Sequence, residues 1–195
     1  AHEVVFDVKC SSMVKNTVEQ CGGHAKMIRT GSSFLRRYLS QTQGKAVFGG
    51  EYAGHYVFND GRGFGYDDGL YAALRVMEYL SQHPETSLSA LFAAYPDRFG
   101  TEDTYISTDH TNPIEVLKLV EARSADLGAS VSKIDGIRLD FQDGFGIMRA
   151  SNTGEYFTVR FDAESAAGLT QIRGTFAAML SDQYPKIAQD MLNAH

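Results

Sequence analysis

The stretch VVFDV at residues 4–8 is a run of β-branched and aromatic side chains, and it predicts a buried β-strand. Two more short strands are predicted at residues 45–48 (KAVF) and 55–58 (HYVF). Helical patterns alternate with these strands as far as Pro96. Alternating strands and helices are typical of an α/β layer, so we expect the first half of the chain to contain a mixed sheet with helices.

The helices of this half are indicated by apolar side chains that recur every three or four residues. Ser32 or Ser33 is predicted to cap the first helix, and Asp67 or Asp68 is predicted to cap the second. A third, shorter helix ends before Pro96.

The second half has a different pattern. Strand-like runs at residues 137–141, 145–150 and 156–161 predict antiparallel strands, with amphipathic helices before and after them. We therefore expect an α/β domain over residues 1–99, followed by a smaller α+β domain over residues 100–195 in which helices back an antiparallel sheet.

The composition argues against several classes of function. The net charge is −6, and no basic run is longer than Arg36-Arg37, which disfavours binding to nucleic acid or to an anionic membrane surface. No apolar run approaches the roughly 18 residues of a membrane span. Cys10 and Cys21 show neither a C-x-x-C nor a zinc spacing, and two lone thiols are typical of the cytoplasm, where we expect the protein to act.

The sharpest local signal is RASNTG at residues 149–154, which lies between two predicted strands. An arginine fork, two hydroxyls, an amide and a flexible glycine are able to surround a phosphate group. The alternative is a polar turn in which Ser151 and Asn152 make local hydrogen bonds.

A second signal is GGEYAGH at residues 49–55. Its glycines allow a ligand to approach the backbone closely, while Glu51 and His55 have the hydrogen-bonding groups that sugar hydroxyls require. The alternative is an ordinary glycine-rich turn with a solvated glutamate. A metal site is not predicted here, because no third ligand stands at a recognisable spacing.

Two weaker signals complete this set. Lys9 follows the first predicted strand, where a functional group in an α/β fold is often found, although a solvated surface lysine is the simpler reading. RTGS at residues 29–32 begins a predicted helix, whose free amides favour anions, although a plain helix cap explains it equally.

Taken together and in this order, these segments resemble the C-terminal half of the α-D-phosphohexomutases, in particular the bacterial phosphomannomutase/phosphoglucomutase branch. The resemblance rests on six short motifs: DVKC at 7–10, RTG at 29–31, GEYAGH at 50–55, FGYDDG at 64–69, DGIR at 135–138 and RASNT at 149–153.

The resemblance implies a fold and a reaction. Members of this family have four domains, of which the third reads the sugar and the fourth grips the substrate phosphate; the first half resembles a truncated third domain, and the second half resembles the fourth. No segment like TASHNP, the phosphoserine loop, and none like DGDGD, the Mg²⁺ loop, occurs in the chain. We therefore expect a substrate-recognition fragment that is inactive alone.

The parent protein would interconvert hexose 6-phosphate and hexose 1-phosphate, of mannose or glucose, through a bisphosphorylated intermediate. By the same resemblance it would need Mg²⁺, with ligands outside this chain, a hexose bisphosphate activator and its own N-terminal domains. The residues implied are Lys9 for catalysis, Glu51, His55, Ala53 and Ser32 for the sugar, and Arg149, Ser151, Asn152 and Thr153 for the phosphate.

Three residues depart from the family pattern. The family usually has His at position 32, Ser at position 53 and Pro at position 155, where this chain has Ser32, Ala53 and Glu155. These departures keep open a non-catalytic module that binds sugar phosphates. A fragment of a phosphoglucosamine mutase is a further alternative, although that branch usually has Gln where Tyr52 stands.

Overall fold

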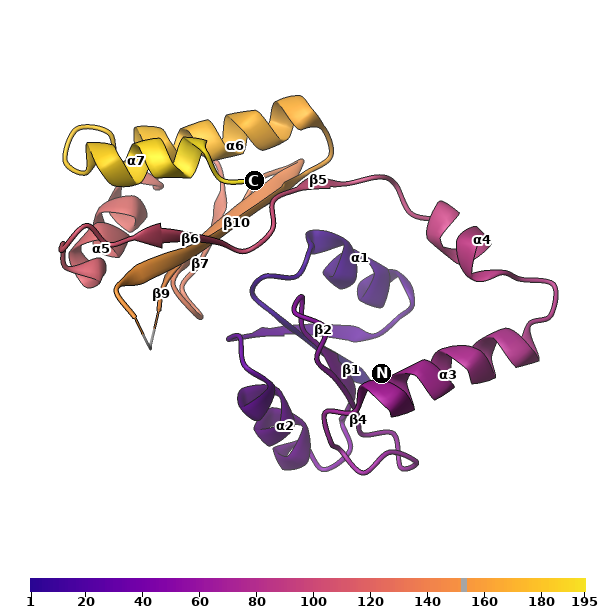
Figure 1. The fold of residues 1–195 in the computed structure, drawn as a ribbon. Helices are drawn as coiled ribbons and strands as arrows, with labels where there is room; N and C mark the ends of the chain where they lie inside the picture. Colours follow the sequence, from indigo (N-terminus) through magenta and orange to yellow (C-terminus); the bar gives the residue numbers. More distant parts are fainter. Residues whose placement is uncertain (152–153) are drawn as a thin grey trace. The chain divides into compact units, whose positions relative to one another are not determined.

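Two separate β-sheets organise the chain (Figure 1). The computed structural model describes residues 1–151 and 154–195. It divides into unit 1, Ala1–Pro96, and unit 2, Asp97–His195. The division falls just before residue 100, because β5 (Phe99–Gly100) pairs with β10 (Tyr156–Ala163) in the second sheet.

The sheet of unit 1 is mixed, as expected from the alternating pattern. Its strands are β1 (Glu3–Asp7), β2 (His24–Ile28), β3 (Ala46–Gly50) and β4 (Tyr56–Phe58), in the order β2-β1-β3-β4. The first three are parallel, and β4 runs antiparallel to β3. The carboxyl ends of β1, β2 and β3 therefore meet at one edge of the sheet.

Two elements of unit 1 were not expected from the sequence. The helix α1 (Ser12–Gln20) and the strand β2 occupy a stretch that shows no long apolar run. Lys26 and His24 of β2 are exposed, because this strand lies at the edge of the sheet, and no residue of α1 is fully buried. Both elements are held by tertiary pairing more than by their own hydrophobic pattern.

One helix cap differs from the prediction. The helix α2 (Ser32–Gln41) is capped by Gly31, so neither Ser32 nor Ser33 is the cap. Gly31 has φ +133°, a conformation that residues with a Cβ rarely adopt. The helix α3 (Gly69–Gln82) is capped by Asp68, whose carboxylate accepts a hydrogen bond from the N–H of Tyr71.

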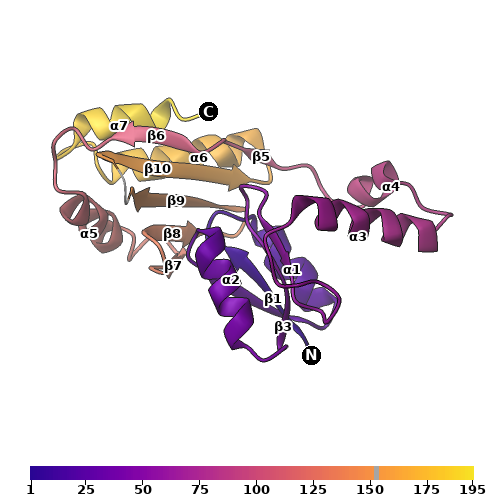
Figure 2. The same ribbon diagram turned by 60° about the horizontal axis from the view of Figure 1, so that its bottom comes forward.

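The core of unit 1 lies between α2 and the sheet. Leu35 and Leu39 of α2 pack against four buried residues of the strands and their ends: Val5, Ile28, Ala46 and Val57. The crossover through α1 and the crossover through α2 run in opposite directions along the sheet, so the two helices lie on opposite faces (Figure 2).

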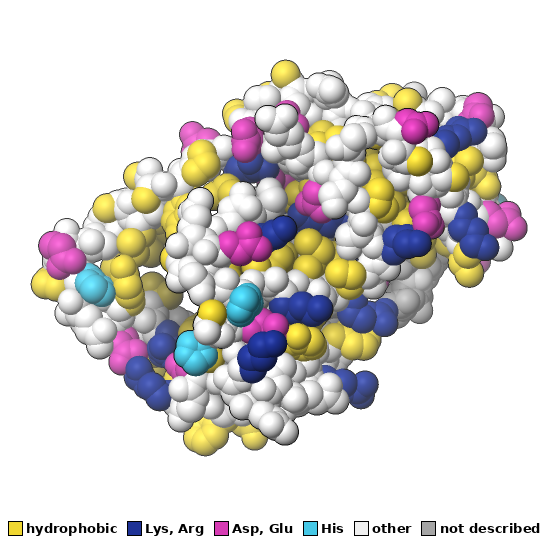
Figure 3. All heavy atoms as spheres, turned by 180° about the vertical axis from the view of Figure 1, so that it is seen from behind, with side chains coloured by type: hydrophobic (Ala, Val, Ile, Leu, Met, Phe, Trp, Pro, Cys, Tyr) yellow, Lys and Arg dark blue, Asp and Glu magenta, His cyan; other side chains and the backbone are white. Residues whose placement is uncertain are grey.

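The helices α3 and α4 (Leu88–Ala93) contain no fully buried residue. Leu70 is 74% exposed and Phe92 is 70% exposed. Hydrophobic side chains show at the surface of this segment, at the left of Figure 3. The amphipathic pattern therefore predicted these two helices correctly, but their apolar faces are not buried. No helix in the described part of the chain combines the length and the hydropathy of a membrane span.

The sheet of unit 2 is antiparallel, as expected, in the order β5-β10-β9-β8-β7, and β6 also pairs with β10. Its remaining strands are β6 (Thr104–Ser107), β7 (Ser130–Ser132), β8 (Ile137–Asp140) and β9 (Gly144–Ala150). The short, polar strand β7 was not predicted, because three residues carry too little of an alternating pattern.

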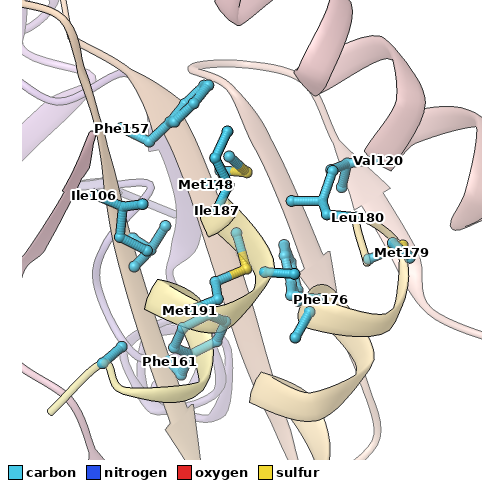
Figure 4. Close-up of a cluster of buried hydrophobic side chains, with 14 of the residues drawn as sticks. Ile106, Val120, Met148, Phe157, Phe161, Phe176, Met179, Leu180, Ile187 and Met191 are labelled. Atoms are coloured by element: carbon cyan, nitrogen blue, oxygen red, sulfur yellow. The ribbon is translucent and has the colours of Figure 1, made fainter. Parts of the chain in front are cut away.

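Three helices cover one face of this sheet: α5 (Pro113–Arg123), α6 (Ala166–Ala178) and α7 (Pro185–Leu192). The side chains drawn in Figure 4 form the core between these helices and the strands. Met148 of β9 belongs to this core, and neighbouring residues of a strand point to opposite faces. Arg149 therefore lies on the face of the sheet opposite the helices.

Candidate functional site

Asp7 organises the carboxyl ends of the parallel strands in unit 1. This residue ends β1 and is completely buried. Its carboxylate accepts hydrogen bonds from Thr30 Oγ1 at 2.8 Å, from Cys10 Sγ at 3.0 Å and from the Tyr52 N–H at 3.1 Å. Because Thr30 follows β2 and Tyr52 follows β3, one carboxylate connects all three strand ends.

Glu51 forms the second link at this edge. The residue is only 4% exposed, and Oε1 accepts a hydrogen bond from the Gly31 N–H at 2.9 Å. The Glu51 N–H donates to the His55 carbonyl at 2.9 Å, and the Gly54 N–H donates to the Glu51 carbonyl at 3.0 Å. The loop from Glu51 to His55 is therefore a closed turn between β3 and β4, and its carboxylate is fixed against the start of α2.

The environment of Glu51 disfavours its charge. Burial raises the pKa of the Glu51 carboxyl above its ordinary value, although the hydrogen bond from the Gly31 N–H works in the opposite direction. The negative charge of Asp7 raises this pKa further, while the positive charges of His55 and Lys9 lower it. A carboxyl group with a raised pKa takes up a proton more readily than a solvated glutamate does.

Lys9 is not a solvated surface charge. It is 5% exposed, and its Nζ lies 5.7 Å from the centroid of the Tyr52 ring. Its positive charge lowers the pKa of the Glu51 carboxyl. The carboxyl edge of the sheet thus brings together Lys9, Glu51 and His55. Lys9 is far from the other two in the sequence, and a turn separates Glu51 from His55.

Two other predicted sugar contacts are less constrained. Ser32 is half-buried and directly follows Gly31, whose amide is bound to Glu51, so it begins α2 at the same edge. Ala53 is exposed in the turn between Glu51 and His55.

His55 has a partner that the sequence interpretation missed. Its Nδ1 lies 2.6 Å from Oδ2 of Asp67, a residue between β4 and α3. The sequence predicts Asp67 or Asp68 as the helix cap and includes both in the FGYDDG motif, and the cap is Asp68. The sequence signal for this contact was a second carboxylate next to the helix cap. Only the folded loop shows that the Asp67 carboxylate reaches His55.

In unit 2, Arg149 is held by a carboxylate in a similar way. Its Nε donates to Asp135 Oδ2 at 3.1 Å, and the two side chains are 15% and 10% exposed. A Cβ on Gly136 would come within 2.3 Å of the Met148 carbonyl and 2.7 Å of the Arg149 Cα. The turn at Asp135 therefore passes directly against β9, and this close approach requires glycine at position 136.

The structure describes only some of the other residues that were predicted to bind phosphate. The Ser151 N–H donates to the Tyr156 carbonyl, and the Ser151 hydroxyl accepts from the Gly154 N–H at 3.2 Å. Asn152 and Thr153 lie outside the described residues. Glu155 is exposed and continues the loop toward β10.

Among residues 1–151 and 154–195, no group of three or more His, Cys, Asp or Glu side chains is arranged to hold a metal ion. The polar edge of unit 1 contains carboxylates, but Asp7 is committed to three hydrogen-bond donors and Glu51 to the Gly31 amide. These residues do not fit a Mg²⁺ site, which uses carboxylates that coordinate the ion directly.

Residues 1–99 match the model of the phosphoglucomutase/phosphomannomutase α/β/α domain III. The chain belongs to the phosphoglucomutase/phosphomannomutase family. A phosphomannomutase/phosphoglucomutase of Pseudomonas putida is 37% identical over 186 residues, which are 95% of this chain and 39% of that protein.

Solved structures show the same relationship. A phosphoglucomutase/phosphomannomutase family protein from Burkholderia thailandensis has a TM-score of 0.80 at 33% identity, covering 93% of this chain and 37% of that one. An N-acetylphosphoglucosamine mutase from Aspergillus fumigatus, solved with GlcNAc-6P and magnesium, has a TM-score of 0.60 at 12% identity, covering 98% of this chain and 40% of that one; it shows the shared fold. The chain thus spans about two fifths of the length of these family members.

Proposed function

We propose that this chain is the substrate-recognition part of a phosphohexomutase that interconverts hexose 6-phosphate and hexose 1-phosphate, with mannose or glucose as the sugar. The observation that carries the proposal is the gathering of Lys9, Glu51 and His55 at one strand edge, in a chain of this family. The carboxyl edge of parallel strands is where α/β folds bind ligands.

The groups in unit 1 suit a sugar. The Glu51 carboxylate accepts hydrogen bonds from neighbouring hydroxyls when it is ionised, and it also donates one when it is protonated. The His55 ring supplies a second group of mixed donor and acceptor character. Lys9 places a positive charge beside Glu51, where it is suited to stabilise a hydroxyl oxygen as that oxygen loses its proton.

The group in unit 2 suits a phosphate. Arg149 uses Nε to bind Asp135, and in the described part of the chain its two terminal nitrogens have no other hydrogen-bond partner. A guanidinium held on one edge presents its remaining donors in a fixed plane, which favours paired hydrogen bonds to phosphate oxygens. Ser151, Asn152 and Thr153 are proposed to add directional hydrogen bonds to the same phosphate.

The phosphoryl-transfer parts of the parent reaction are proposed to lie outside this chain. When bound there, Mg²⁺ would neutralise charge on the transferring phosphoryl group. The present residues would hold the sugar in either orientation, because a fixed phosphate site accepts either end of a hexose that carries phosphate at O1 or O6. Neither Cys10 nor Cys21 forms a disulfide in the described part of the chain, which supports a reducing compartment, the cytoplasm, as the proposed place of action.

Calorimetry on the 195-residue chain tests this proposal. We expect weak binding of glucose 1-phosphate and mannose 1-phosphate, and no conversion to the 6-phosphates in the presence of Mg²⁺ and glucose 1,6-bisphosphate. Absence of binding at millimolar ligand would remove the recognition role. Turnover by the chain alone would show that it already contains the transfer machinery.

A non-catalytic sensor of sugar phosphates is the second candidate, because Ser32, Ala53 and Glu155 all depart from the family pattern. The longer parent protein separates the two: binding without turnover favours the sensor. Conversion of glucosamine phosphate by the parent would instead favour the phosphoglucosamine mutase branch, despite Tyr52.

A further inference from the structure

The short segment that joins β4 to α3 brings a carboxylate onto the His55 ring. Asp67 Oδ2 lies 2.6 Å from His55 Nδ1, and Asp67 Oδ1 accepts a hydrogen bond from the Tyr56 N–H at 3.3 Å. An isolated antiparallel bridge between Val57 and Asp67 fixes the backbone at the same place. One carboxylate oxygen and the main chain of Asp67 are therefore positioned by β4, and the other oxygen lies against His55.

This contact is not a by-product of helix capping. The neighbouring Asp68 supplies the cap of α3 through the Tyr71 N–H at 2.9 Å. Asp67 makes no contribution to that cap, so the two adjacent carboxylates have separate partners. The His55 and Asp67 side chains are 45% and 26% exposed, so the pair is partly shielded from water.

We propose that Asp67 is a positioning residue that fixes the tautomer and the orientation of His55. An ionised carboxylate accepts hydrogen bonds only, so in the neutral imidazole the proton resides on Nδ1 and Nε2 is left as an acceptor. Among the described residues Nε2 of His55 has no hydrogen-bond partner. Nε2 is thus the nitrogen available to accept a hydrogen bond from a hydroxyl group of a ligand.

The inference rests on the proposed function, in which His55 contacts the sugar. It adds a preference for ligands that offer a hydroxyl donor. His55 follows Glu51 across the closed turn, in which the Glu51 N–H donates to the His55 carbonyl at 2.9 Å. An acceptor nitrogen on the His55 ring selects ligands with hydroxyl donors. A ligand that offers only an ether or a carbonyl oxygen at that position cannot donate to Nε2.

Nitrogen-15 NMR of the histidine rings in the 195-residue chain tests the inference directly. At pH 8, above the ordinary range in which histidine is charged, the His55 signals, assigned with His55→Gln, should show a protonated Nδ1 and an unprotonated Nε2. Asp67→Ala should move the ring toward the Nε2-protonated tautomer. Asp67→Asn should largely keep the wild-type tautomer, because its amide oxygen still accepts from Nδ1–H.

Asp68→Asn is the matched control, since it alters a neighbouring carboxylate that only caps α3. It should leave the His55 signals unchanged. Amide spectra of all variants establish that the fold is kept, and the wild-type tautomer decides the inference if Asp67→Ala does not fold. A wild-type ring protonated on Nε2, or a tautomer that is the same in wild type and Asp67→Ala, would overturn the inference.

Binding of glucose 1-phosphate by the same variants separates this inference from the proposed function. We expect Asp67→Ala to weaken binding several-fold while Asp67→Asn largely restores it. If the wild-type chain fails to bind, the proposed function is lost but the tautomer result still decides the role of Asp67. Normal binding together with an Asp67-independent tautomer contradicts the positioning role alone.

Discussion

Unit 2 and unit 1 are stabilised in different ways. Unit 2 buries a continuous apolar core in which Phe157, Phe161 and Phe176 are all inaccessible to solvent. Unit 1 has a much smaller buried cluster around Leu35 and Leu39, and its longest helix, α3, buries no residue completely. The strand ends of unit 1 are held in place instead by hydrogen bonds to buried carboxylates.

This difference predicts that stability and the proposed ligand recognition rest on separate residues in unit 2 and on shared residues in unit 1. In unit 2 the apolar core lies on one face of the sheet, and Arg149 lies on the other. In unit 1 the same polar residues that hold the strand ends together, above all Asp7, also surround the groups proposed to bind the sugar. Mutations in the core of unit 2 should therefore act on stability, whereas mutations at the edge of unit 1 should act on both properties.

The largest expected effect is the loss of a core aromatic ring. Phe176→Ala should destabilise unit 2 by about 3–5 kcal/mol, because it removes buried contacts and leaves a cavity. Hydrogen exchange resolved along the chain should show lost protection in β8, β9 and β10. Phe64→Ala is the control, since Phe64 is 89% exposed. Equal effects of the two changes would contradict the assigned core.

A smaller loss is expected from the polar centre of unit 1. Asp7→Asn removes one acceptor oxygen and the charge from a buried group with three donors, and it should cost about 1–3 kcal/mol in the unfolding free energy of unit 1. Hydrogen exchange in β1, β2 and β3 measures this change. Asp126→Asn, at an exposed position, should have no such effect. An unchanged exchange pattern in Asp7→Asn would show that packing alone holds the strand ends.

Arg149→Ala tests the proposed phosphate contact. It removes a charge-assisted contact, so binding of hexose 1-phosphate should weaken by about 1.5–3 kcal/mol, roughly 10- to 150-fold. Calorimetry measures the affinity, and thermal unfolding measures the stability. Arg149→Lys should recover only part of the affinity, because lysine keeps the charge but not the planar fork. An affinity that does not change in Arg149→Ala would remove Arg149 from the site.

The smallest effect, and the only one with the opposite sign, concerns Glu51. Because burial raises its pKa in the folded chain, ionisation of Glu51 reduces stability as the pH rises from its unfolded pKa through its folded pKa. Glu51→Gln should therefore raise the melting temperature slightly at pH 7 and have little effect below pH 4, the ordinary range of a glutamate pKa. Sugar-phosphate binding should weaken in the same variant. A stability difference that is equal at both pH values would contradict the raised pKa.

Much of the fold could be read from local pattern. The strands β1, β3, β8, β9 and β10 follow from apolar or alternating runs, and the helices α3 to α7 follow from apolar periodicity and caps such as Asn112 with Pro113. The strands β2 and β7 and the helix α1 could not be found in this way, since an edge strand or a surface helix needs little apolar surface of its own. The cap of α2 was also missed, because Gly31 is selected by its backbone angle and by its hydrogen bond to Glu51.

The fold class of both halves and the motifs that place the chain in its family follow from the sequence, because hydrophobic periodicity and short polar motifs are local properties. The contacts between polar groups are visible only in the folded chain, where Asp7 meets Thr30 and Tyr52. Asp67 meets His55 in the same way, across separate segments. The physical reason is that such pairs depend on how parallel strands and their connections are brought together. Burial then gives these contacts their strength, and burial is a property of the folded chain alone.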